Sequence, residues 1–352
     1  MFVDIKLTRW AIVLCICMAL LPPLAPAQKA KPSEQRFTPV LWRDPGNIRE
    51  RDLFYGPGSP EKAPRAPFTF VEEQRDGESP KFEVKDANDV TWVVKMGPES
   101  QSEIISTRIV WAMGYFAEEA YYFERVPVQG LPRLSRGRQY IDNNMHVRGA
   151  RFEPRREKVK RGPTWSWLKN PFVGRREFNG LKTLMVLLAN YDTSTANNRI
   201  LTVMNPENGR MEDHYTVTDI GATLGAIGGL GGKRSKNNLS DYRSARLIKR
   251  VRNGMVEFQY RTRPAGLGIF TFVFSPGYWR SQTNKEKAMQ QIRAEHVRWI
   301  GGMLSRLTDD QLRDAFRAAG YSTGTMNGFV REIRERIVEI NSAQPRRRAG
   351  RA

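Results

Sequence analysis

The stretch NYDTSTANN, residues 190–198, is the most informative part of this sequence. Asp192 follows an amphipathic helical pattern over residues 177–189, and Asn197 stands five positions later in an irregular segment. A carboxylate in such a loop can accept a proton from an attacking hydroxyl, and an amide oxygen can ligate a metal ion. The same residue types also favour ordinary turns after a helix, so this spacing alone does not decide between catalysis and a turn.

Two distant motifs make the interpretation more specific. In TDIG, residues 218–221, Asp219 ends a strand-like run 22 residues after Asn197, across one predicted hairpin. A carboxylate there suits a magnesium ion that bridges phosphate oxygens. In VVK, residues 93–95, Lys95 ends another strand-like run and can direct a fixed positive charge at phosphates. Taken alone, Asp219 could be a β-turn residue and Lys95 a surface lysine. Together with Asp192 and Asn197, they form the set of residues that phosphoryl transfer from a metal nucleotide requires.

Glu103 is the predicted partner of Lys95. The helix expected over residues 100–113 would place Glu103 one turn from its start, where it could hold Lys95 in an ion pair. Glu99 is the other candidate for this pair. Ser100 and Glu103 also have the spacing of a capping box, in which Glu103 would bind the backbone of Ser100 instead.

The composition indicates a basic protein. The 352 residues include 57 Lys and Arg against 37 Asp and Glu, for a formal net charge of +20. Such a surface attracts phosphorylated ligands, acidic proteins or anionic polymers, although a basic-biased proteome would give the same balance. The three histidines have no metal-ligand spacing, and residues 228–233 lack the first Gly and the final Ser or Thr of a phosphate loop.

The N-terminus predicts export. Residues 1–27 combine a positive start, an apolar run of 12 residues and a small-residue cleavage site, as in a secretory signal peptide. The run is shorter than the ~20 residues that cross a bilayer, so no transmembrane span is expected in the mature chain. Both cysteines lie in this segment, which leaves no thiol chemistry for the mature protein. We expect a periplasmic or extracellular location.

The remaining chain divides into four predicted parts. Residues 28–66 form an extended arm, 67–157 a β-rich part with one helix, 158–343 a larger and mainly helical part, and 344–352 a basic disordered tail. Strands are expected at 68–74, 81–85, 90–95, 121–128, 149–153, 200–203 and 214–218. Beyond position 241 the pattern is mostly helical, with helices over 289–307, 312–319 and 325–340 and a capping box from Thr308 to Gln311.

Together and in this order, these motifs resemble the protein-kinase-like superfamily, and more its divergent phosphatidylinositol-kinase, HipA-type and secreted spore-coat branches than ordinary protein kinases. The resemblance covers residues 68–221. It implies a two-lobed α+β fold and a nucleotide, ATP with Mg or Mn, as ligand. The loop at residues 75–80, with Gly77, would cover the phosphates, which Lys95 would contact while Glu103 holds it, and residues 151–153 would lie at the hinge.

The resemblance also assigns the chemistry. Asp192 would be the catalytic base, and Asn197 and Asp219 would hold the metal ion. Three departures bear on activity: the loop keeps one Gly, Asn190-Tyr191 replaces the usual His-Arg pair, and Ser194 stands where a phosphate-contacting Lys is common. The expected function is therefore an exported kinase-like phosphotransferase with an acidic or phosphorylated acceptor. A catalytically inactive pseudokinase and a basic polyanion-binding protein are the alternatives.

Overall fold

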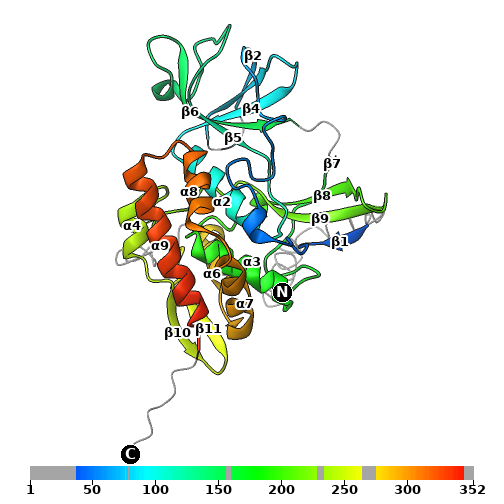
Figure 1. Ribbon diagram of the computed structural model, residues 1–352, viewed down its shortest axis with the longest axis vertical. Helices are drawn as coiled ribbons and strands as arrows, with labels where there is room; N and C mark the ends of the chain where they lie inside the picture. Colours follow the sequence, from blue (N-terminus) through cyan, green and yellow to red (C-terminus); the bar gives the residue numbers. More distant parts are fainter. Residues whose placement is uncertain are drawn as a thin grey trace, which may run out of the picture. The chain divides into compact units, whose positions relative to one another are not determined.

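The computed structural model describes residues 37–75, 77, 79–155, 160–227, 234–263 and 275–344 (Figure 1). These residues belong to one compact unit that begins at Phe37. The predicted signal peptide, the phosphate-loop-like stretch 228–233 and nearly all of the predicted tail lie outside the described residues. No helix within the described ranges is both long and apolar enough to cross a membrane.

A five-stranded sheet forms the first part of the unit. Its order is β2-β3-β4-β6-β5, and every neighbouring pair is antiparallel. The strands are β2 (Thr69–Gln74), β3 (Lys81–Lys85), β4 (Thr91–Met96), β5 (Tyr121–Pro127) and β6 (His146–Pro154). The strands predicted at 68–74, 81–85 and 90–95 are therefore confirmed as β2, β3 and β4, and β6 and β5 extend the sheet beyond β4.

Alternating side chains give this sheet its own hydrophobic core. Phe82 and Val84 on β3 and Trp92 and Val94 on β4 are buried, and Phe152 on β6 joins them. Period-two alternation of this kind places one face of each strand against a core. Lys95 on β4 pairs with Arg151 on β6 across the sheet. Residues 151–153, predicted to form a hinge, thus lie within a central strand.

Helix α2 (Glu99–Ala112) connects the sheet to the helical part. Its residues Ile104, Ile105, Ile109 and Val110 are buried in a second and larger core, which also contains α3 (Arg176–Leu187). A helix buried on almost all sides is typical of a core helix rather than a surface helix. Side chains that α2 presents at its start are therefore fixed in position by packing along its length.

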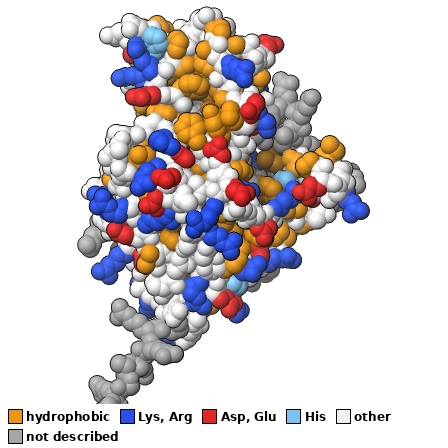
Figure 2. Space-filling view, viewed as in Figure 1, with side chains coloured by type: hydrophobic (Ala, Val, Ile, Leu, Met, Phe, Trp, Pro, Cys, Tyr) orange, Lys and Arg blue, Asp and Glu red, His pale blue; other side chains and the backbone are white. Residues whose placement is uncertain are grey.

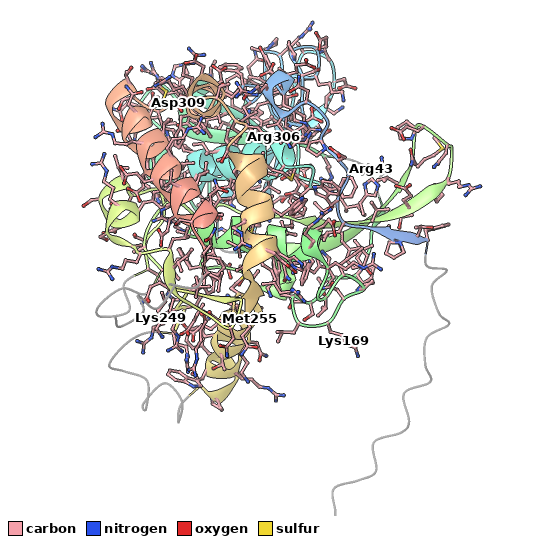
Figure 3. All side chains as sticks on the ribbon, turned by 60° about the horizontal axis from the view of Figure 1, so that its bottom comes forward. Arg43, Lys169, Lys249, Met255, Arg306 and Asp309 are labelled. Carbon is pink, nitrogen blue, oxygen red and sulfur yellow. The ribbon has the colours of Figure 1, made fainter. Side chains whose placement is uncertain are left out.

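The second sheet has the order β1-β9-β8-β7, and it contains the Asp219 hairpin. Its strands are β1 (Thr38–Val40), β7 (Lys160–Arg161), β8 (Asn198–Met204) and β9 (Met211–Val217). Strand β1 pairs in parallel with β9. Arg43, just beyond β1 and labelled in Figure 3, forms an ion pair with Glu212 on β9. Part of the predicted extended arm thus completes this sheet.

Beyond position 241 the chain is less helical than the sequence pattern predicts. A small sheet, β10-β11-β12, is formed by Ile248–Arg252, Met255–Phe258 and Ile292–Arg293, and Lys249 and Met255 mark its hairpin in Figure 3. The helices are α4 (Leu239–Ser244), α6 (Pro276–Ala288), α7 (Ala294–Leu304), α8 (Asp309–Arg317) and α9 (Thr323–Asn341). The helix predicted over 289–307 is present as the shorter α7, because the chain between α6 and α7 forms the strand β12. The capping box from Thr308 to Gln311 is confirmed.

The predicted α+β class is confirmed. A β-sheet part with one following helix precedes a part dominated by helices, and the second and third sheets are additions to the latter. In Figure 1 the five-stranded sheet lies at one end of the described unit and the β10–β11 hairpin at the other, with most helices between them. The residues singled out by the sequence lie where the first sheet, α2 and the β8–β9 hairpin meet.

Candidate active site

The β8–β9 hairpin brings Asn197 and Asp219 to the same end of the second sheet. Asn198 at the start of β8 is opposite Val217 at the end of β9. One step outward, the backbone nitrogen of Thr218 donates to the carbonyl oxygen of Asn197 at 2.8 Å, and the Thr218 hydroxyl donates to the same oxygen at 3.1 Å. The antiparallel register thus explains why two residues 22 positions apart in sequence become neighbours.

The loop after α3 joins Asp192 to Asn197. The Asn197 Nδ2 atom donates to the backbone oxygen of Asp192 and to its carboxylate Oδ2, both at 3.1 Å. At the other side, the Asp192 backbone nitrogen donates to Asn190 Oδ1 at 2.9 Å, in the side-chain-to-backbone pattern of an Asx turn. The turn predicted as an alternative is therefore present, and it is the turn that positions the Asp192 carboxylate.

Lys95 is the centre of a buried ionic cluster. Its Nζ atom lies 2.6 Å from Asp219 Oδ1, 2.9 Å from Glu99 Oε2 and 3.2 Å from Glu103 Oε2. The Lys95 side chain is 7% exposed and that of Asp219 53%, so the cluster extends from the interior to solvent. Three segments that are distant in sequence, namely β4, α2 and the end of β9, contribute to it.

The surrounding carboxylates keep Lys95 charged. Burial lowers the pKa of Lys95, but the negative charges around it, that of Glu103 above all, outweigh this effect and raise the pKa above its ordinary value. Burial also raises the pKa of Glu99, yet its ion pairs with Lys95 and Lys236 prevail and lower that pKa to about 2. The cluster therefore holds a permanent cation between acidic groups.

Glu103 does not serve as a helix cap. Helix α2 begins at Glu99 with Pro98 at its N-cap and no side-chain cap hydrogen bond. The Ser100 hydroxyl donates instead to the carbonyl oxygen of Lys95 at 3.0 Å. Of the two alternatives for Glu103, the ion pair is the one that forms. Its other carboxylate oxygen lies 3.3 Å from Arg151 NH1, so two cations fix this fully buried carboxylate.

Gly221 allows the Asp219 segment to approach α2 closely. A Cβ atom at this position would lie 2.7 Å from the Cβ of Glu99 and 3.3 Å from Glu103 Oε2. The Ser102 hydroxyl donates to the Gly221 carbonyl oxygen at 2.6 Å. Asp219 itself has a φ of 51°, a left-handed conformation that non-glycine residues adopt rarely and mostly where tertiary contacts impose it. The close approach to α2 thus explains why a glycine stands two residues after Asp219.

Gly77 is not in direct contact with the Lys95 cluster. It has a φ of 71°, and its carbonyl oxygen accepts a hydrogen bond from Arg136 NH1 at 2.7 Å. The same loop reaches the cluster through Ser79, whose hydroxyl donates to Glu99 Oε2 at 3.2 Å. The structure places this loop at the end of β2 and β3, on the side of the sheet where Lys95 meets α2.

Lys285 is the site residue that sequence analysis missed. Its Nζ atom lies 2.6 Å from Asp192 Oδ1, although the two residues are 93 positions apart. The Lys285 side chain is 11% exposed, so α6 holds the amine in a largely enclosed position. No spacing rule connects α6 to the Asp192 loop, and the polar sequence of α6 gives little helical signal. Only the tertiary structure could identify this residue.

The donor set suits a magnesium or manganese ion bound with a nucleotide. Because Asn197 Nδ2 is engaged by Asp192, the amide oxygen is the atom that would be available to a metal ion. Among the described residues no group of three or more His, Cys, Asp or Glu side chains could hold a metal ion by itself. Magnesium is often held by one or two carboxylates and completed by phosphate oxygens and water. An amide and one exposed carboxylate fit that mode and not an all-protein metal site.

No protein-family model matches this sequence, and neither does any curated protein. Among solved structures, the chain is similar to the Helicobacter pylori proinflammatory kinase CtkA, with 12% identity, a TM-score of 0.42, and coverage of 79% of this chain and 98% of the other. A Golgi casein kinase has 12% identity, a TM-score of 0.31 and coverage of 84% of both chains. Because both TM-scores are below 0.5, we base the function on the geometry of the site.

Proposed function

We propose that this protein binds ATP with magnesium or manganese and transfers the terminal phosphoryl group to a hydroxyl acceptor. The observation that carries the proposal is the cluster in which Lys95 contacts Asp219 at 2.6 Å and Glu103 at 3.2 Å. A buried cation beside an exposed carboxylate and an amide is what a triphosphate with its metal ion requires. Phosphoryl transfer depends mainly on positioning and electrostatic stabilisation, which a prearranged cluster supplies.

Each residue has a defined part in the proposed reaction. Asp192 accepts the proton of the acceptor hydroxyl as the acceptor oxygen bonds to phosphorus and the bond to the ADP oxygen breaks. Lys95 offsets negative charge on the phosphates, with Glu103 holding its amine. Asn197 and Asp219 would hold the metal ion, which would neutralise charge on the phosphate oxygens.

Lys285 completes this set. Ser194 cannot provide the charge that a lysine at its position would bring, but the Lys285 amine reaches the Asp192 carboxylate from α6. In this position it orients Asp192 and adds a positive charge beside the transferred group. Lys285 therefore supplies, from a distant part of the chain, the positive charge that Ser194 lacks.

A thermal-shift titration tests nucleotide binding. A ligand that binds the folded state raises the apparent stability by mass action, roughly 2.7 kcal/mol at a hundred times its Kd. We expect ATP to raise the melting temperature of the protein only with magnesium or manganese, and Asp219→Asn to abolish this rise. Asp192→Asn should keep the rise and lose transfer. A wild-type protein that does not respond to ATP with either metal ion contradicts the proposal.

Two observations favour the alternatives named for this chain. The carboxylates of Asp192 and Asp219 are each paired with a lysine, an arrangement that an inactive nucleotide-binding protein would also tolerate. Basic side chains are spread over the face shown in Figure 2 and intermixed with acidic ones, as expected if anionic polymers bind through general charge. ATP binding without phosphoryl transfer would favour the pseudokinase. Polyanion binding without ATP binding would favour the polyanion-binding protein.

We also propose that the protein acts outside the cytoplasm. The proposal is supported by the positive start, apolar run and small-residue cleavage site of residues 1–27. N-terminal sequencing of the protein from the periplasmic or extracellular fraction should give a chain that begins at Gln28. A full-length chain confined to the cytoplasm would contradict it.

A further inference from the structure

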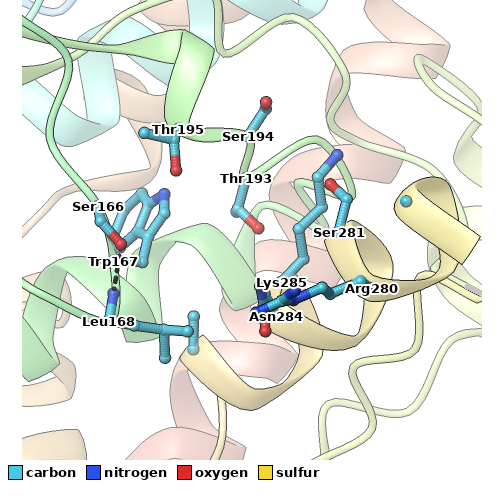
Figure 4. A pocket seen from close by; sticks show the side chains of 12 residues that line it. Ser166, Trp167, Leu168, Thr193, Ser194, Thr195, Arg280, Ser281, Asn284 and Lys285 are labelled. Carbon is cyan, nitrogen blue, oxygen red and sulfur yellow. Dashed lines mark hydrogen bonds between the residues drawn. The ribbon is translucent and has the colours of Figure 1, made fainter. Parts of the chain in front are cut away.

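A pocket of about 300 Å³ lies next to the Asp192 loop (Figure 4). Helix α6 forms one side of it, with Arg280 and Lys285. The residues that follow Asp192, Thr193 to Thr195, form a second side, and Ser166 to Leu168 form the third. Lys285 lines the pocket and also pairs with Asp192, and Thr193 follows Asp192 in the chain, so the pocket adjoins the proposed catalytic base.

Trp167 presents a buried and unsatisfied donor in this pocket. The residue is 4% exposed, and its Nε1 atom has no hydrogen-bond partner within the described part of the chain. The neighbouring Trp165 is satisfied, since its Nε1 donates to the Thr216 carbonyl oxygen at 3.1 Å. A buried donor without a partner destabilises the folded state. An acceptor atom of a bound ligand would remove that cost.

The charge of the pocket selects the kind of ligand. Arg280 and Lys285 contribute two cations, while no Asp or Glu side chain is among the residues that line it. Asn284 and the hydroxyls of Thr193 and Ser281 add further polar contacts. Guanidinium and ammonium groups bind phosphate and carboxylate oxygens with charge-assisted hydrogen bonds, which are stronger than neutral ones.

We propose that this pocket binds the acceptor of the phosphoryl group, and that the acceptor is a small hydroxyl compound carrying a phosphate or carboxylate group. Arg280 and the Trp167 indole bind the anionic end, and the hydroxyl lies beside Lys285, at the side of the pocket next to Asp192. This inference rests on the proposed phosphotransferase function and deepens it, because it names the chemical class of the second substrate.

Calorimetric titration with glycerol 3-phosphate and with glycerate, and with glycerol as the neutral control, tests the inference. We expect both anions to bind and glycerol not to bind. Arg280→Gln should weaken anion binding at least about tenfold, and Trp167→Phe, which keeps the ring but removes the donor, about fivefold. The matched control is Lys287→Gln, since Lys287 is an exposed cation two residues beyond Lys285 and outside this pocket. It should bind as the wild type does.

Nucleotide binding in the same proteins separates this inference from the proposed function. Asp219→Asn should abolish ATP binding and leave anion binding intact, and a non-hydrolysable ATP analogue with magnesium should not compete with the anion. The pocket assignment is overturned, while the nucleotide site stands, by any of three results. These are no binding of the anions, competition by the ATP analogue, or an equal loss of anion affinity in Lys287→Gln and Arg280→Gln. A wild-type protein that binds the anions but no nucleotide overturns the acceptor role together with the proposed function.

Discussion

At the scale of single residues, Lys285 offers the sharpest test of the site. Its amine lies 2.6 Å from Asp192, where a positive charge would meet the terminal phosphate of ATP but not ADP. We expect Lys285→Ala to weaken binding of ATP with magnesium about tenfold or more, since a hydrogen bond to a charged group contributes about 1.5–3 kcal/mol. Binding of ADP should change little. Isothermal titration with both nucleotides measures the difference.

Lys287→Ala is the control for this prediction, because it removes the same charge from the same helix at an exposed position. It should preserve the ratio of the ATP and ADP affinities. If Lys285→Ala lowers both affinities equally, the lysine has a structural role only. Thermal unfolding of each variant without nucleotide shows whether the fold is retained.

Several of the residues that sequence analysis identified have their neighbours in the same local motif. Asp192 and Asn197 share one loop, and Asn197 and Asp219 are the two ends of one hairpin, so spacing alone places them together. Arg151 and Lys285 reach Glu103 and Asp192 from distant elements. Such contacts depend on how whole elements pack, and no local sequence pattern predicts them.

At the scale of elements, the first turn of α2 makes the site sensitive to acid. Glu99 on that turn pairs with Lys95 at 2.9 Å and with Lys236 at 2.6 Å, and its pKa is lowered to about 2 from an ordinary value of 4.5. A carboxyl whose pKa is lower in the folded state stabilises the protein above its unfolded pKa and loses that effect as the pH falls. Glu99 therefore contributes most at neutral pH.

Glu99→Gln should accordingly lower the free energy of unfolding by about 2 kcal/mol at pH 7. The difference from wild type should shrink as the pH falls from about 5 towards 2, where the wild-type carboxyl becomes protonated as well. Urea unfolding between pH 7 and pH 3.5 measures this. Glu207→Gln, at an exposed position in the β8–β9 turn, is the matched control. A Glu99→Gln deficit that stays constant over this range would contradict the assigned ion pairs.

Elements were predictable where hydrophobic periodicity was strong. The strands β2 to β4 and the helices α2 and α3 lie within a residue or two of their predicted bounds, and β3, β4 and α3 each bury a set of apolar side chains. Helix α6 was missed because its sequence, PGYWRSQTNKEKA, contains few apolar residues. The β10–β11 hairpin was missed because its alternation is obscured by basic residues on the exposed face.

At the scale of the whole molecule, Arg108 connects the N-terminal segment to the core. Its guanidinium is buried within α2 and donates to the carbonyl oxygen of Phe54 at 2.8 and 3.0 Å and to that of Ala120 at 3.3 Å. Burial lowers the pKa of Arg108 to about 10, which still leaves it charged at neutral pH. The segment containing Phe54 continues from β1, which completes the second sheet.

Arg108→Met should therefore destabilise the protein by at least about 3 kcal/mol, because buried carbonyl groups lose a charged donor while the apolar volume is largely kept. Arg49→Met, at an exposed position in the same N-terminal segment, should change stability by less than about 0.5 kcal/mol. Chemical unfolding of both variants measures this. Equal stabilities for the two would show that the hydrogen bonds of Arg108 do not hold the segment to the core.

The net charge of +20 makes a separate prediction for the whole surface. Attraction of a polyanion by dispersed cations depends on the total charge and is screened by salt, with a Debye length of about 10 Å at 0.1 M ionic strength. Retention on a heparin column should therefore fall steeply with salt and remain the same in Asp219→Asn and Lys285→Ala, whereas binding of ATP should be lost or weakened in those variants. A substitution at Asp219 that abolishes heparin retention would show that one site binds both ligands, and the polyanion rather than the nucleotide would then become the leading candidate for its natural ligand.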